Sequence, residues 1–179
     1  MTTALWLMGV QGLLGVWDTV YYHEWRARLP ARASVMGQEL RLHAVRSLIY
    51  GVVFCTLPWF AWTGPFAVVL MALLVGEAVI TFADFLVEDR VRTVLGGVFP
   101  GERITHGIIG VVYGAFLAFL VPVLAGWLAG GGPAPSDVAI PDLARAALTV
   151  LGMGAALSGI RDALAASGLR HAAWPWRVA

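Results

Sequence analysis

The chain has 179 residues, of which 59% are apolar, and a formal net charge of +1. Soluble domains use only about 45–50% apolar residues, so this composition indicates an integral membrane protein. The small net charge and the lack of a basic patch with interleaved aromatic residues exclude a nucleic-acid partner. The single cysteine, Cys55, excludes a disulfide framework and a cysteine-ligated metal site.

Five apolar segments are expected to form helices that cross a membrane, because a bilayer core of about 30 Å needs roughly 20 apolar residues. They are residues 4–22, 35–60, 66–85, 103–128 and 143–166. The fifth segment is less hydrophobic and rich in Ala and Gly, which is consistent with close helix packing. The sequence therefore predicts an all-α helical bundle in a membrane, with residues 1–179 forming a single transmembrane domain.

Arginine is distributed unevenly among the connections between these segments. The first and third connections and the C-terminal tail contain Arg26, Arg28, Arg32, Arg90, Arg92, Arg170 and Arg177, and the other two connections contain none. The positive-inside rule then predicts a protein of the cytoplasmic membrane with its N-terminus outside and its C-terminus in the cytoplasm.

One stretch of the chain occurs twice. Glu39, His43, Tyr50 and Gly51 recur 63 residues later as Glu102, His106, Tyr113 and Gly114. The upstream stretch Glu24-Trp-Arg-Ala-Arg28 recurs at an offset of 64 as Glu88-Asp-Arg-Val-Arg92. Fixed-period similarity of this kind indicates a duplicated helical hairpin. We expect repeat 1 over about residues 4–62, repeat 2 over about 66–128, and a four-helix core that leaves the fifth helix outside the repeat.

The repeated polar residues are candidate metal ligands. In each copy the Glu and the His are four residues apart, so they share one face of a helix. Four carboxylates that converge without cations would repel each other, and two divalent metal ions would neutralise them. Oxygen-rich sites with two histidines suit iron or manganese, and zinc is an alternative. The predicted ligands, near the cytoplasmic face, are Glu24, Glu39, His43, Glu88, Glu102 and His106.

This ligand set resembles that of the di-iron and di-manganese carboxylate four-helix bundles, in which two helices each give a Glu and two give Glu-xx-His pairs. The resemblance covers about residues 10–125 and rests on ligand types and symmetry. It implies a di-iron oxidoreductase that activates oxygen and acts on a lipophilic substrate such as a membrane lipid or quinone. Electrons would come from a separate protein partner, since no nucleotide motif is present. The spacing departs from the family, because here it is Glu-xxx-His, and this changes the ligand angles.

Other readings of the same residues stay open. The glutamates can be helix caps or interfacial ion pairs. His43 and His106 can be axial ligands of a b-type haem in an electron-transfer protein. The acidic face of the third helix can serve a carrier of protons or divalent metals, and a zinc hydrolase would use the same ligands.

Several further polar residues are expected near the site. Arg46 is expected to pair with Asp84 or to anchor an anionic head group. Glu77 and Asp84 share a face with Glu88, where they would orient ligands or form a proton path. Tyr50 and Tyr113 lie two turns deeper than the histidines and either donate to the site or only pack. Asp18 and His23 are reserve ligands.

Overall fold

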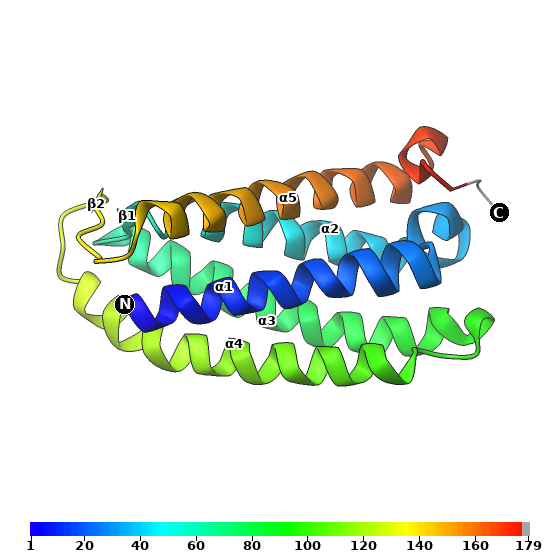
Figure 1. Cartoon of the computed structure of the whole chain (residues 1–179), viewed down its shortest axis with the longest axis horizontal. Coiled ribbons are helices and arrows are strands. Elements are labelled where there is room, and N and C mark those ends of the chain that lie inside the picture. Colours follow the sequence, from blue (N-terminus) through cyan, green and yellow to red (C-terminus); the bar gives the residue numbers. More distant parts are fainter. Residues whose placement is uncertain (177–179) are drawn as a thin grey trace.

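The computed structural model describes residues 1–176, and it is a bundle of five long helices that lie side by side (Figure 1). The helices are α1 (Thr2–Trp17), α2 (Ala33–Thr56), α3 (Pro65–Val91), α4 (Pro100–Trp127) and α5 (Asp142–Ala166). The predicted all-α class is therefore confirmed. Proline occupies the first turn of α3 and of α4, where its missing N–H has no helical partner to lose.

Short elements close the two ends of the bundle. At one end, β1 (Phe60–Ala61) pairs antiparallel with β2 (Ala134–Pro135). At the other end, α1 continues as the π-helix η1 (Asp18–Ala27), and the 3₁₀ turns η2 (Leu29–Arg32), η3 (Arg92–Leu95) and η4 (Arg170–Ala173) follow α1, α3 and α5. The arginine-rich connections thus all lie at the end opposite the strands (Figure 1).

The packing of the helices is uneven. α2 packs closely against α5 and also against α3, whereas α1 packs mainly against α4. A core of fully buried apolar side chains, including Leu5, Leu57, Leu70 and Leu120, fills the half of the bundle nearer the strands. The other half of the interior contains buried polar and charged residues.

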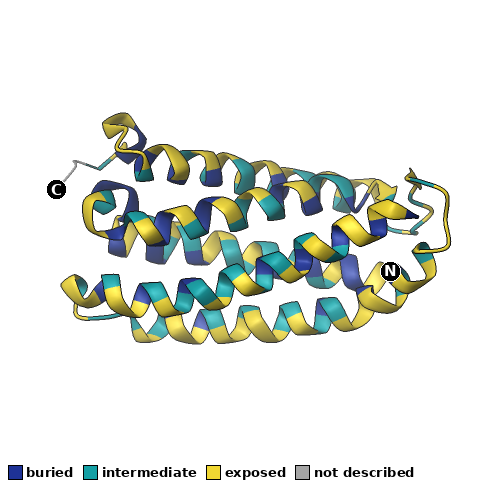
Figure 2. Ribbon diagram, turned by 180° about the vertical axis from the view of Figure 1, so that it is seen from behind, coloured by how far each residue is buried: buried dark blue, intermediate teal, exposed yellow. Residues whose placement is uncertain are grey.

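The exposed residues lie on the outward faces of the helices (Figure 2), and many of them are large and apolar. Every helix exposes large apolar side chains, for example Leu13, Val52, Val79, Val111 and Leu157. Three helical segments are long and apolar enough to cross a membrane, namely Pro65–Leu95, Pro100–Trp127 and Asp142–Ala166. The α-helical part of α1 has only 16 residues, and the first half of α2 is strongly polar.

Small residues allow α2 and α5 to approach closely. A Cβ atom added at Gly51 would lie 2.8 Å from Cβ of Ala156, and one added at Gly159 would lie 2.8 Å from the carbonyl oxygen of Ala44. Interfaces of this kind let helix backbones meet without a side chain between them. The close packing of α5 against α2 therefore depends on the absence of side chains at these glycines.

We predict that Gly51→Ala destabilises the protein, while Gly114→Ala at the repeat-related position does not. Both substitutions favour the helix by a similar amount, but no atom lies within 4 Å of a Cβ added at Gly114. Overpacking costs about 1–3 kcal/mol, and this is the expected difference between the two variants. Thermal unfolding of the purified proteins in detergent measures it, and equal stabilities would contradict the proposed packing constraint.

Candidate metal centre

The π-helical backbone of η1 determines which side chains enter the bundle after α1. Residues five apart share a face of a π-helix, and Asp18 and His23 are five apart. His23 Nε2 lies 3.3 Å from Asp18 Oδ2, and both side chains are buried. An α-helical backbone would instead have placed Tyr22 on the face of Asp18. The π-helix therefore turns His23 toward Asp18 and Glu102, and its neighbour Glu24 toward Arg161.

Four buried side chains from η1 and α4 meet at this point. Their donor atoms all lie within 4.8 Å of one another, so the group could hold a metal ion. His23 Nε2 is 3.2 Å from Glu102 Oε1, and His106 Nε2 is 3.2 Å from Asp18 Oδ2. A buried oxygen of the group, Asp18 Oδ1, has no hydrogen-bond partner among the described residues. We call Asp18, His23, Glu102 and His106 the metal cluster.

Arg92 at the start of η3 joins the two hairpins beneath the metal cluster. Its side chain is fully buried, and Nη2 lies 2.7 Å from Glu39 Oε1 and 3.0 Å from Glu102 Oε1. Nε of Arg92 also donates to Glu39, at 2.9 Å. The guanidinium thus binds both glutamates of the repeated Glu-xxx-His motif. The sequence marked Arg92 only as one of the arginines that set the orientation.

His43 lies in a second polar group that adjoins the metal cluster. Its Nε2 is 2.9 Å from Asp84 Oδ2, and Arg46 Nη1 approaches the same oxygen at 3.1 Å. The ring of His23 stacks on that of His43, with 4.5 Å between the centroids. The expected contact between Arg46 and Asp84 is therefore present, and His43 shares it.

The six ligands expected from the repeat do not form one group of ligands. Glu102 and His106 belong to the metal cluster, and Glu88 Oε1 lies 3.6 Å from His106 Nδ1. Glu39 is bound by Arg92, and His43 by Asp84. Glu24 belongs to neither group, and it accepts hydrogen bonds from Arg161 and from Nε1 of Trp176.

Acidic residues outnumber basic ones in this buried network. The arginines Arg46 and Arg92 face five buried carboxylates, those of Asp18, Glu39, Asp84, Glu88 and Glu102. Five negative and two positive charges leave three negative charges for the imidazoles or a bound cation to neutralise. Buried charges without compensation are strongly destabilising, so a divalent ion at the metal cluster suits the electrostatics of the site.

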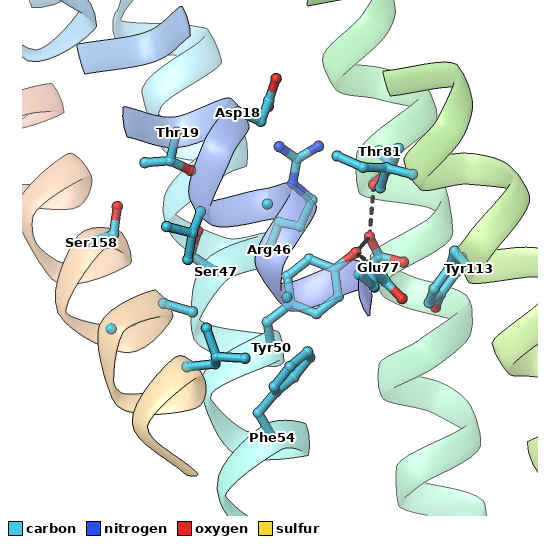
Figure 3. Close-up of a pocket in the computed structure, with 18 of the residues that line it drawn as sticks. Asp18, Thr19, Arg46, Ser47, Tyr50, Phe54, Glu77, Thr81, Tyr113 and Ser158 are labelled. Carbon is cyan, nitrogen blue, oxygen red and sulfur yellow. Dashed lines mark hydrogen bonds between the residues drawn. The ribbon is translucent and has the colours of Figure 1, made fainter. Parts of the chain in front are cut away.

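A cavity of about 710 Å³ begins at the metal cluster and extends between the helices. Asp18, Arg46 and His106 line its polar end, and the remaining wall is mostly apolar. Deeper in the cavity, Tyr50 donates a hydrogen bond of 2.5 Å to Glu77 (Figure 3). Tyr113, its counterpart in the repeat, donates instead to the carbonyl of Leu74 at 3.0 Å. The hydroxyl groups of both tyrosines thus donate to α3 and not to the metal cluster.

We predict that Arg92→Met destabilises the bundle by about 3–5 kcal/mol, because it leaves Glu39 and Glu102 buried without their cation. Arg90→Met is the control, since Arg90 is exposed and, among residues 1–176, its side chain donates only to the carbonyl of Leu86. Adding Glu39→Gln to Arg92→Met is expected to restore part of the loss. Chemical or thermal unfolding in detergent measures all three, and a similar loss for Arg90→Met would contradict the role given to Arg92.

Comparison with known proteins found no match from which a function could be inferred. No protein-family model, no curated protein and no solved structure matches this chain. The function must therefore be inferred from the metal cluster and the cavity.

Proposed function

We propose that this protein is a membrane-embedded, metal-dependent oxidoreductase that acts on a lipophilic substrate held in the cavity. The observation that carries the proposal is that Asp18 and His106 belong to both the metal cluster and the cavity wall. A ligand in the cavity would therefore lie beside the metal ligands. Cavities of about 300–1,000 Å³ with mostly apolar walls and a few convergent polar groups are typical small-molecule sites.

The distribution of side chains supports insertion in a membrane. Apolar residues cover the outside of the bundle, and the buried ionisable residues face its interior, as expected for charged groups inside a bilayer. With the N-terminus outside, the arginine-rich end of the bundle and the metal cluster lie near the cytoplasmic face of the cytoplasmic membrane.

The arrangement of the helices supports the proposed duplication. α1 packs on α4 and α2 packs on α3, and a two-fold axis relating the hairpins would exchange these two contacts. His43 contacts Asp84, and His106 contacts Asp18, so each histidine meets an aspartate of the other hairpin. The two aspartates are 66 residues apart and the two histidines 63. The first hairpin thus has three more residues between its aspartate and its histidine than the second hairpin has. Its π-helix accounts for extra residues, because a π-helix has more residues per turn than an α-helix.

We propose one metal ion per chain, held by Asp18, His23, Glu102 and His106. The second ion expected from the repeat would compete with Arg92 for Glu39 and with Asp84 for His43. Two imidazoles with carboxylates are found in non-haem iron sites, and manganese and zinc accept the same donors. We propose that the ion is iron, which when bound would supply one-electron chemistry with oxygen. Electrons would still need a separate donor.

The neighbouring residues would hold the ligands in place. Arg92 donates to both carboxylate oxygens of Glu102, at 3.0 and 3.5 Å, and Glu88 lies beside the other ring nitrogen of His106. Partners of this kind orient metal ligands, and losing one usually costs about 10–100-fold in affinity or activity. The apolar wall of the cavity would exclude water from the substrate.

One observation favours the alternative that the protein is a carrier of protons or divalent metals. Glu77, Asp84 and Glu88 are all buried along α3, and they form an acidic path from the cluster to the middle of the bundle. The path ends there, because the half of the bundle nearer the strands is filled by apolar side chains. The b-type haem reading is less favoured, since the His23 ring lies against those of both His43 and His106.

We predict that the purified protein contains one divalent metal ion, most of it iron, per chain and shows no Soret band. His23→Ala and His106→Ala should each lower the metal content by more than about tenfold, since even the loss of an orienting partner has an effect of about 10–100-fold. His43→Gln should retain the metal. Elemental analysis and an optical spectrum of protein that elutes normally on gel filtration measure these values.

The exposed residue His171 provides the control, and His171→Ala should leave the metal content unchanged. Two metal ions per chain, lost in His43→Gln, would support the di-metal site instead. A Soret band would support the haem protein, and metal-free native protein would contradict the proposed function.

A further inference from the structure

Glu77 is a buried acidic residue in the middle of α3 that the proposed metal site does not use. Its side chain is 2% exposed, and it lines the cavity. α3 belongs to a segment that is long and apolar enough to cross a membrane. An ionisable residue at such a position is costly and usually marks a functional site with a partner.

The partners of Glu77 are all neutral. Oε1 accepts hydrogen bonds from Tyr50 at 2.5 Å and from Thr81 at 2.8 Å (Figure 3). Gln11 donates to the Tyr50 oxygen at 3.0 Å, so the hydroxyl proton of Tyr50 is directed at Glu77.

Glu77 is not paired with a positive group among residues 1–176, because Arg46 interacts with it only at longer range and is itself paired with Asp84. Glu77 forms no salt bridge with the described residues, and its Oε2 has no hydrogen-bond partner among them. Each of the five carboxylates of the network around the metal cluster, in contrast, contacts an arginine or a histidine. The Glu77 side chain is thus buried among neutral donors, and its Oε2 is available to a donor group of a ligand in the cavity.

The wall around Glu77 suits an organic cation. Tyr50 and Tyr113 come from α2 and α4 to the two sides of Glu77, and the ring of Phe54 lies one turn beyond Tyr50 (Figure 3). Aromatic faces attract ammonium groups, and the attraction is stronger where water is excluded. A small inorganic cation would find fewer oxygen ligands here than its usual six or more.

We propose that Glu77 binds the ammonium group of an amphiphilic amine, whose hydrocarbon part occupies the apolar cavity. Glu77 and Asp84 are seven residues apart on α3, or about 10 Å along the helix. The ammonium would therefore anchor the ligand, while a different part of it lies beside the metal cluster. The proposal rests on the proposed function only where it identifies the amine as the substrate, because binding at Glu77 needs no metal.

Equilibrium binding of radiolabelled dodecylamine to the protein in lipid nanodiscs tests the proposal, with empty nanodiscs as the baseline. Dodecanol is the matched neutral ligand. We expect one saturable amine site per chain and at least tenfold weaker binding of dodecanol. Glu77→Gln should weaken amine binding at least tenfold and leave dodecanol binding unchanged, since the amide oxygen still accepts from Tyr50 and Thr81.

The matched control is Glu24→Gln, because Glu24 also lines the cavity but is paired with Arg161. It should bind the amine like the unchanged protein. Equal binding of amine and alcohol, unsaturable amine binding, or equal losses in Glu24→Gln and Glu77→Gln would each overturn the proposal. The comparison of amine with alcohol needs no variant, so it decides the matter even where Glu77→Gln does not fold.

The same measurement after metal chelation separates this proposal from the proposed function. A protein that carries no metal but binds the amine at Glu77 would refute the metal enzyme and support the cation site. A metal-loaded protein without saturable amine binding would support the metal enzyme and refute the cation site at Glu77.

Discussion

The fully buried guanidinium of Arg92 is the interaction on which the polar half of the bundle depends. It lies between Glu39 of α2 and Glu102 of α4 and compensates part of a large buried negative charge. A planar guanidinium with five fixed donors can bind two carboxylates at once, which a lysine cannot do in the same geometry. Because Glu102 is also a member of the metal cluster, the position of that ligand is coupled to the packing of α2 against the rest of the bundle.

The π-helix after α1 gives the two hairpins different roles. In the second hairpin, α3 stays α-helical to Val91, and Asp84 and Glu88 both face inward. In the first hairpin, η1 brings Asp18 and His23 inward and directs Glu24 to Arg161 on α5. π-Helical segments are frequent at functional sites, and here the segment supplies half of the metal cluster. Two hairpins that share a pattern of polar residues can in this way form a site whose two sides differ.

The metal cluster and Glu77 are two separate polar sites on the wall of one largely apolar cavity. The first offers imidazoles and carboxylates beside two arginines, and the second offers a single carboxylate among aromatic rings. Under the two proposals, an amphiphile would be held at Glu77 and would react beside the metal cluster. The close contact of α5 with α2 closes one side of this cavity, which explains why a helix outside the repeat contributes to its wall.

The sequence by itself determined the helical class, the approximate helix boundaries and the end of the bundle at which the charged residues gather. It also predicted the contact between Arg46 and Asp84, because both positions follow from α-helical spacing within regular helices. Only the tertiary structure decided that Arg92 is buried, that His23 and not Glu24 belongs to the metal cluster, and that Glu77 borders a cavity. Spacing along the chain tells which residues share a face only while the backbone stays α-helical. Packing between distant segments determines where the backbone becomes π-helical and which arginine of a charged connection is drawn between two buried glutamates.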